Sequence, residues 1–163
     1  MTNWEIRQKW KELHQNAALR NTLRPEIRDS WERSFDYGIN PMLRENPYIC
    51  TQNEFLQYKD NAGYLIEASN RVMNSLFEFV AGTGFVVILS DANLCILKVI
   101  GDTESRTWSD NAHLVEGSLW TEELVGTNAG ALSIALAKPV SVFGYEHFCL
   151  FSHVAACSCA PIK

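Results

Sequence analysis

Apolar residues in the first 82 positions recur every three or four residues, which is the spacing of one face of a helix. The pattern predicts a helix over residues 2–17, a second over 25–38 and a longer one over 51–82. The first and third begin with a Thr-x-x-Glu capping box, and the second begins with Pro25, which suits the first position of a helix. Gly63 is expected to weaken or break the third helix.

The pattern changes after residue 84. Residues 85–91 and 94–102, FVVILSD and LCILKVIGD, are short apolar runs rich in β-branched residues, and the Asp-Ala-Asn sequence is a turn signal. They predict an antiparallel hairpin in a sheet that is buried on at least one face. The polar residues 103–119 predict a loop or short helices that cover this sheet.

The end of the chain combines one helix with further strands. A helix is expected over residues 128–137, and we interpret Thr127 as its cap in preference to an anion-binding turn at this position. Residues 139–144 and 145–159 predict two more strands. Helices first, then strands with one inserted helix, indicate an α+β domain with an antiparallel sheet.

The composition is that of one folded domain. Of the 163 residues, 47% are hydrophobic and 20% are charged, which excludes a disordered chain and leaves room for one domain with a helical extension. The net charge of -5 and the absence of a basic run argue against nucleic-acid contact by this chain. No apolar stretch approaches the roughly 20 residues of a membrane span, and the charged start differs from a signal peptide, so we expect a cytoplasmic chain without membrane contact. The five scattered cysteines are expected to be reduced thiols.

Several phrases in a fixed order carry a resemblance to a known family. Together they resemble the N-terminal region of sigma-54-dependent transcription activators of the acetoin-catabolism and glycerol-metabolism regulator type. The match spans most of the chain. The phrases are LRPEIRDSWERSFDYGINP at 23–41, ILSDAN at 88–93, WTEELVGTNAG at 120–130, KPVSVFGYEHF at 138–148 and CSCAPI at 157–162.

The resemblance implies a helical region at residues 1–50 and a GAF-like sensor domain at 51–163, with a six-stranded antiparallel sheet and a ligand pocket. In such activators a central ATPase and a helix-turn-helix follow, and this chain contains neither a phosphate-binding loop nor a recognition helix. The chain is therefore expected to bind a small-molecule effector and to control a downstream module. No cofactor, no metal and no enzymatic activity are expected.

The sequence departs from the family pattern at two points. The family usually reads GTNAIGTAL where this chain reads GTNAGALSIAL, so the start of that helix differs and the ligand preference can differ with it. The pattern also continues into further strands where this chain stops at Lys163. Because a sheet that lacks strands exposes unpaired edges, we expect a truncated sheet and a homodimer.

Aromatic and polar residues near the predicted sheet are the candidate ligand contacts. Aromatic rings can hold a small, partly apolar effector or a quaternary ammonium group. Glu146 and His147 do not form an acid/base pair if they are neighbours in a strand, because they would face opposite sides. Trp120 is the strongest candidate, because the resembled motif begins with it. The predicted ligand-binding residues are Phe85, Trp108, Trp120, Asn128, Tyr145, His147, Phe148 and Cys157.

A thiol- or metal-based redox sensor is the alternative function. His153, Cys157 and Cys159 are all odd-numbered, so in a strand they would point to one face, as ligands of a soft metal must. A structural zinc needs a fourth ligand, however, and buried cysteines more often act as small hydrophobic residues. We therefore favour the receptor.

Overall fold

The computed structural model describes residues 1–152 and 155–162. Contacts divide the chain into two compact units, one of Met1–Arg44 with Trp120–Lys163 and one of Glu45–Leu119, and each is described by itself. The predicted domains, residues 1–50 and 51–163, stay a prediction. The two units are defined by contacts within the chain, which do not show which residues fold independently.

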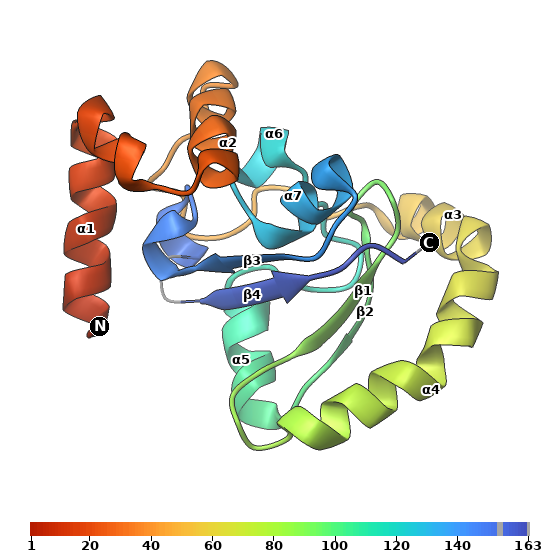
Figure 1. Cartoon of the computed structure of the whole chain (residues 1–163). Helices are drawn as coiled ribbons and strands as arrows, with labels where there is room; N and C mark the ends of the chain where they lie inside the picture. Colours follow the sequence, from red (N-terminus) through yellow and green to blue (C-terminus); the bar gives the residue numbers. More distant parts are fainter. Residues whose placement is uncertain (153–154, 163) are drawn as a thin grey trace. The chain divides into compact units, whose positions relative to one another are not determined.

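The first unit combines the two ends of the chain. Figure 1 shows α1 and α2 side by side, with the short 3-10 helix η1 between them. Its elements are α1 (Asn3–Gln15), η1 (Ala17–Thr22), α2 (Pro25–Asp36), α6 (Glu122–Val125), α7 (Ala129–Leu136), β3 (Val140–Phe143), η2 (Gly144–Glu146), η3 (Leu150–Ser152) and β4 (Ala156–Cys159).

The predicted helix starts of this unit are confirmed. Thr2 accepts a hydrogen bond from the Glu5 backbone while the Glu5 carboxylate accepts one from the Thr2 backbone, so both ends of the capping box are made. Pro25 is the first residue of α2, where the missing N–H costs no helical hydrogen bond. Trp10 and Trp31 are buried on the inner faces of α1 and α2.

Strands β3 and β4 form an antiparallel pair on which α7 packs. Val140 lies opposite Cys159 and Val142 opposite Cys157, so these side chains share the face that is turned to the core. The core of the unit draws on both ends of the chain. Its buried residues are Trp10, Leu13, Leu23, Ile27, Trp31, Ala129, Leu132, Val140, Val142, Phe148 and Cys149.

The strand predicted over residues 145–159 is wrong in its first half. The extended chain stops at Gly144, whose φ of 46° lies in the left-handed region, and two 3-10 turns follow. The Glu146 carboxylate accepts a hydrogen bond from the Phe143 backbone at 2.9 Å, which closes the first turn. Among the residues that the structure describes after this turn, strand pairing begins at Ala156, the start of β4.

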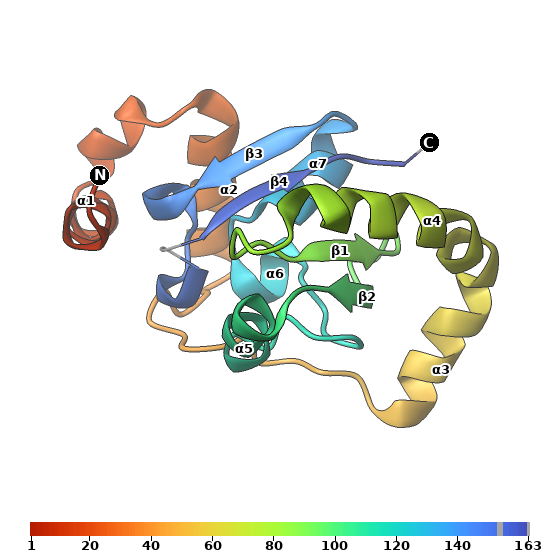
Figure 2. The same cartoon turned by 90° about the horizontal axis from the view of Figure 1, so that it is seen from below.

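The second unit contains a helical arm and a hairpin. Figure 2 shows α4 running along the β1–β2 hairpin. The capping box of Thr51 with Glu54 is confirmed, and the predicted break at Gly63 is confirmed because α3 ends at Asn61 and α4 begins at Gly63. The elements are α3 (Gln52–Asn61), α4 (Gly63–Val80), β1 (Val87–Ser90), β2 (Ile96–Ile100) and α5 (Thr103–Asn111).

The predicted hairpin of this unit is also confirmed. Strands β1 and β2 pair antiparallel, with Val87 opposite Ile100 and a register shift between Leu89 and Ser90. The Asp91 carboxylate closes the turn by accepting hydrogen bonds from the backbones of Asn93 and Cys95. Residues 103–119 include one of the predicted short helices, α5, whose N-cap is Asp102.

The fold class predicted from the sequence, α+β with antiparallel pairing and leading helices, is confirmed. In the described residues the strands form two separate two-stranded sheets, plus single bridges from Ile49 to Ser118 and from Cys95 to Leu119, where the resemblance implied one six-stranded sheet. No helix in the described ranges is long and apolar enough to span a bilayer.

Two glycines, Gly126 in the first unit and Gly63 in the second, differ in how closely their surroundings are packed. A Cβ at Gly126, where φ is 68°, would lie 2.7 Å from the Phe148 Cβ, whereas a Cβ at Gly63 would meet nothing within 4 Å. We expect Gly126→Ala to lower the free energy of unfolding by about 2–4 kcal/mol through strain and overpacking. Gly63→Ala should raise it by up to about 1 kcal/mol. Denaturant unfolding measures both, and equal effects of the two variants would contradict this packing.

Candidate functional site

The predicted ligand-binding residues fall in both units. Phe85 and Trp108 belong to the second unit, and the other six belong to the first. Phe85 follows α4 and is half exposed, and Trp108 is a half-buried residue of α5. The two sets are therefore considered separately, and the structure brings together candidates only within the first unit.

Trp120 and Asn128 are joined by a hydrogen bond at the entry to α7. The Asn128 amide donates to the carbonyls of Trp120 at 3.1 Å and Gly126 at 3.0 Å. Its Oδ1 accepts from the Ala131 backbone at 2.9 Å, so Asn128 is the N-cap of α7 and the predicted Thr127 cap is wrong. The Trp120 ring meets the edge of the Phe151 ring, with the centroids 5.7 Å apart.

Thr127 instead belongs to a buried polar network with α2. Its hydroxyl is hydrogen-bonded to the Ser30 hydroxyl at 2.8 Å, and Ser30 donates its proton to the Glu122 carboxylate. Arg33 donates two hydrogen bonds to the same carboxylate, at 2.8 and 2.9 Å, which raises the pKa of the arginine. The last turns of α2 are thus tied to α6. Sequence reasoning missed this network, because no local motif links residues about ninety positions apart.

A second arginine ties the start of α2 to η2. Arg24 donates to both carboxylate oxygens of Glu146, at 3.1 and 2.7 Å, and this pairing raises the pKa of Arg24. Trp31 donates from its indole N–H to the Glu146 carbonyl at 2.7 Å. The side chain and the backbone of Glu146 therefore both hold α2. The interpretation of Glu146 and His147 as strand neighbours is wrong, because they lie in and after a 3-10 turn.

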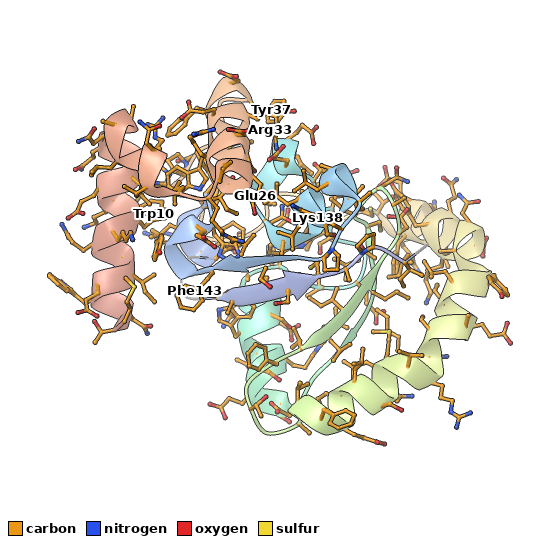
Figure 3. The ribbon with its side chains drawn as sticks, in the orientation of Figure 1. Trp10, Glu26, Arg33, Tyr37, Lys138 and Phe143 are labelled. Carbon is orange, nitrogen blue, oxygen red and sulfur yellow. The ribbon has the colours of Figure 1, made fainter. Side chains whose placement is uncertain are left out.

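Phe148 is the centre of a cluster of rings from three segments. It is fully buried, and its ring centroid lies 4.9 Å from that of Phe35 and 5.4 Å from that of Trp31. Its carbonyl accepts the indole N–H of Trp10 at 3.0 Å. Figure 3 shows the labelled Trp10 on α1, extending toward the segment that follows β3. Phe148 thus anchors both N-terminal helices.

His14 lies inside this cluster. Its ring centroid is 4.1 Å from that of Trp10, 4.3 Å from that of Trp31 and 5.0 Å from that of Phe148. Nδ1 is bonded to the Trp10 carbonyl, and Nε2 has no hydrogen-bond partner within the part of the chain that the structure describes. Burial, reinforced by the Arg20 charge, lowers the pKa of His14 to about 4.

Tyr145 and His147 flank the buried turn. The Lys9 ammonium lies 4.2 Å from the centroid of the Tyr145 ring, a cation–π contact that joins α1 to η2. His147 is almost fully buried, and its Nδ1 is hydrogen-bonded to the Gly144 carbonyl at 3.1 Å. Tyr145 is therefore placed where movement of α1 would reach it.

Cys157 and Cys159 share one face of β4, as the sequence predicted, and pack against the core. Burial raises the pKa of Cys157 to about 12 and also raises that of Cys159, which keeps both as unreactive thiols near neutral pH. His153, the third member of the proposed redox site, lies outside the described residues. Among those described, no three His, Cys, Asp or Glu residues form a metal site.

Two open grooves lie on α1. One of about 380 Å³ runs between α1 and η1 and is lined by Trp4, Glu5, Lys9 and Leu19 among others. The second, of about 280 Å³, lies between α1 and the Pro41–Met42 segment. Neither is lined by a predicted ligand-binding residue, so the ligand roles of all eight candidates stay predictions.

Comparisons with known proteins agree with this architecture. The family model of the MimR N-terminal domain matches residues 6–163. The acetoin dehydrogenase operon transcriptional activator AcoR of Bacillus subtilis (strain 168) is 29% identical over 156 residues, which are 95% of this chain and 26% of the relative. The propane 2-monooxygenase operon transcriptional activator MimR of Mycolicibacterium goodii is 26% identical over 93% of this chain and 25% of its own length. The chain therefore spans about a quarter of the length of these relatives.

A solved structure shares the fold. A chain in the crystal structure of the Escherichia coli DhaR(N)–DhaL complex superposes with a TM-score of 0.81 at 19% identity, covering 85% of this chain and 47% of that chain. At this identity the likeness concerns the fold alone. The resemblance to N-terminal regions of acetoin-type activators is confirmed by the family match and by the two relatives.

The half-buried His14 makes the stability of the first unit depend on pH. Because the pKa of His14 is about 4 in the folded chain and near 6.5 when exposed, the unfolded state binds the extra proton first. The stability of the first unit should be complete above pH 6.5 and should fall as the pH drops toward 4. Thermal melts across this range should show a smaller decline for His14→Phe. An unchanged decline in that variant would assign the acid sensitivity to other groups.

Proposed function

The chain belongs to the MimR N-terminal domain family, and on that premise we propose that it is the effector-sensing domain of a bacterial sigma-54-dependent transcription activator. Binding of a small molecule would control an ATPase and a DNA-binding module elsewhere in such a protein. The named relatives are transcription activators, which suggests a regulatory domain and not an enzyme. A GAF-type sensor, a cytoplasmic location and a homodimer belong to the same proposal.

The docking of α1 and α2 is the observation that supports this role best. Both helices are held by a short segment, because Glu146 bonds to Arg24 and Trp31 while Phe148 accepts from Trp10. A ligand that shifts this segment has to shift the helices too, since their buried donors would otherwise lose their partners. Two packings of the helices with different ligand affinities are what an allosteric sensor requires.

The candidate contacts of the first unit surround the same segment. Trp120, Tyr145 and His147 all lie within or beside the elements that hold α2, and Phe148 is part of the anchor itself. A small, partly apolar effector that displaces part of this aromatic packing would directly change the positions of α1 and α2. Phe85 and Trp108 remain candidate contacts on the second unit.

A ligand screen with matched tryptophan variants tests the receptor proposal. Thermal shift is measured for the chain with small diols, ketones, organic acids and methylated amines. A ligand at 100 times its Kd should stabilise the folded state by about 2.7 kcal/mol. The shift should be reduced in Trp120→Phe, which keeps an aromatic ring beside Phe151, and unchanged in Trp4→Phe, whose parent residue is 73% exposed.

Failure of every compound class to stabilise the chain would count against effector binding. A hit that shifts both variants equally would remove Trp120 from the contacts and leave the receptor role standing.

A further inference from the structure

The smaller of the two grooves described on α1 has two walls that are held by the same segment. It has a volume of about 280 Å³ and is lined by Trp10, Lys11, His14, Gln15, Pro41 and Met42. On one wall the Trp10 indole donates to the Phe148 carbonyl. On the other, the Pro41 carbonyl accepts a hydrogen bond from the Leu150 backbone at 2.8 Å. Both walls are therefore fixed on residues 148–150, and the groove, named here the Lys11 groove, is formed without a ligand.

The inner side of the Lys11 groove is apolar. The His14 ring lies against the buried Trp10, with the centroids 4.1 Å apart. Burial lowers the pKa of His14 to about 4, so the ring is uncharged at neutral pH. Across the groove Met42 is 55% exposed, and its flexible side chain can adapt to a bound apolar group. A short hydrocarbon chain placed here would exchange water for two rings and a thioether.

The rim of the Lys11 groove is positively charged. None of the described residues that line it is acidic. Lys11 is exposed, and the exposed Arg7 lies one turn earlier on the same face of α1. Neither side chain forms an ion pair or a hydrogen bond with the described residues. Their two full charges exceed the partial negative charge, about half an elementary charge, at the end of the helix. The rim therefore favours an anion, although the net charge of the chain is -5.

The other groove on α1 has a different charge. It is lined by two carboxylates, Glu5 and Glu12, and by Lys9, whose ammonium already lies over the Tyr145 ring. An anion is disfavoured there by the two carboxylates. The preference for an anion is therefore specific to the Lys11 groove.

We propose that the Lys11 groove binds a small carboxylate that carries a short apolar chain. The carboxylate pairs with the Lys11 ammonium and lies within reach of the Gln15 amide, one turn further along α1. The hydrocarbon chain lies along Trp10, His14 and Met42. Because the volume is just below the range of about 300–1,000 Å³ for drug-sized ligands, the chain has only a few carbon atoms.

This site goes beyond the proposed function, because it is separate from the candidate contacts around Trp120. Its ligand would touch α1 beside the Trp10 indole, and so would bear on the same helix docking from the opposite side of the Phe148 carbonyl bond.

Titration of the ¹⁵N-labelled chain with sodium butyrate, followed by NMR, tests the site and the ligand class together. The backbone amides of residues 10–15 and 42–43 should shift and reach saturation. Butylammonium chloride and 1-butanol have the same chain length but lack the negative charge, and should shift these amides several-fold less at equal concentration. Sodium chloride at the same ionic strength controls for the added salt.

Three variants separate the charged contact from the apolar one. Lys11→Gln should weaken butyrate binding about two- to fivefold, the range expected for an exposed ion pair. Lys138→Gln removes an exposed lysine of the same unit that does not line the groove, and should leave the affinity unchanged. Met42→Ser should reduce the preference for butyrate over acetate.

The contrary outcomes are distinct. Absence of saturable shifts at residues 10–15 overturns the site, and equal shifts with butylammonium overturn the anionic ligand class. Shifts confined to residues 120–148 would place carboxylate binding at the contacts of the proposed function and overturn the Lys11 groove. A stabilisation by organic acids that Lys11→Gln reduces and Trp120→Phe leaves unchanged belongs to this groove, so the two proposals fail separately.

Discussion

Two indole N–H groups fix the positions of α1 and α2 in the first unit. Trp10 on α1 donates to the Phe148 carbonyl, and Trp31 on α2 donates to the Glu146 carbonyl, both in the buried interior. A buried donor without an acceptor costs about 1–3 kcal/mol, so each helix is held at the one position that satisfies its indole. The packing of Phe148 between Trp31 and Phe35, and the ion pair of Arg24 with Glu146, depend on that position.

The N-terminal helices are therefore part of a core and not an appendage to one. The sequence marks both ends of α2 with arginines, and each arginine finds a carboxylate on a distant segment, Glu146 or Glu122. These pairs are partly exposed and contribute modestly to stability, but they fix orientation. This arrangement suits a regulatory domain, because a shift of residues 120–148 would break hydrogen bonds that hold α1 and α2.

Local features of this chain could be predicted from the sequence, and distant contacts could not. The capping boxes at Thr2 and Thr51, the start at Pro25 and the hairpin around Asp91 each depend on residues a few positions apart. The 3-10 turn that begins at Gly144 could not be predicted, because Glu146, which closes it, is held by the distant Arg24 and the turn packs against α1. Thr127 and Asn128 are both suitable N-cap residues, so the sequence alone does not show which of them caps α7. In the structure Asn128 is the cap, and the Thr127 hydroxyl is hydrogen-bonded to Ser30, almost a hundred residues earlier.

Hydrogen–deuterium exchange at the amides of α2 tests most directly whether the helices belong to the core. If the indole and arginine bonds hold α2 as described, its central amides should exchange as slowly as those of α7, through opening of the whole first unit. Slow exchange in α7 together with fast exchange throughout α2 would show that α2 opens by itself, and would contradict the coupling on which the proposed sensing mechanism depends.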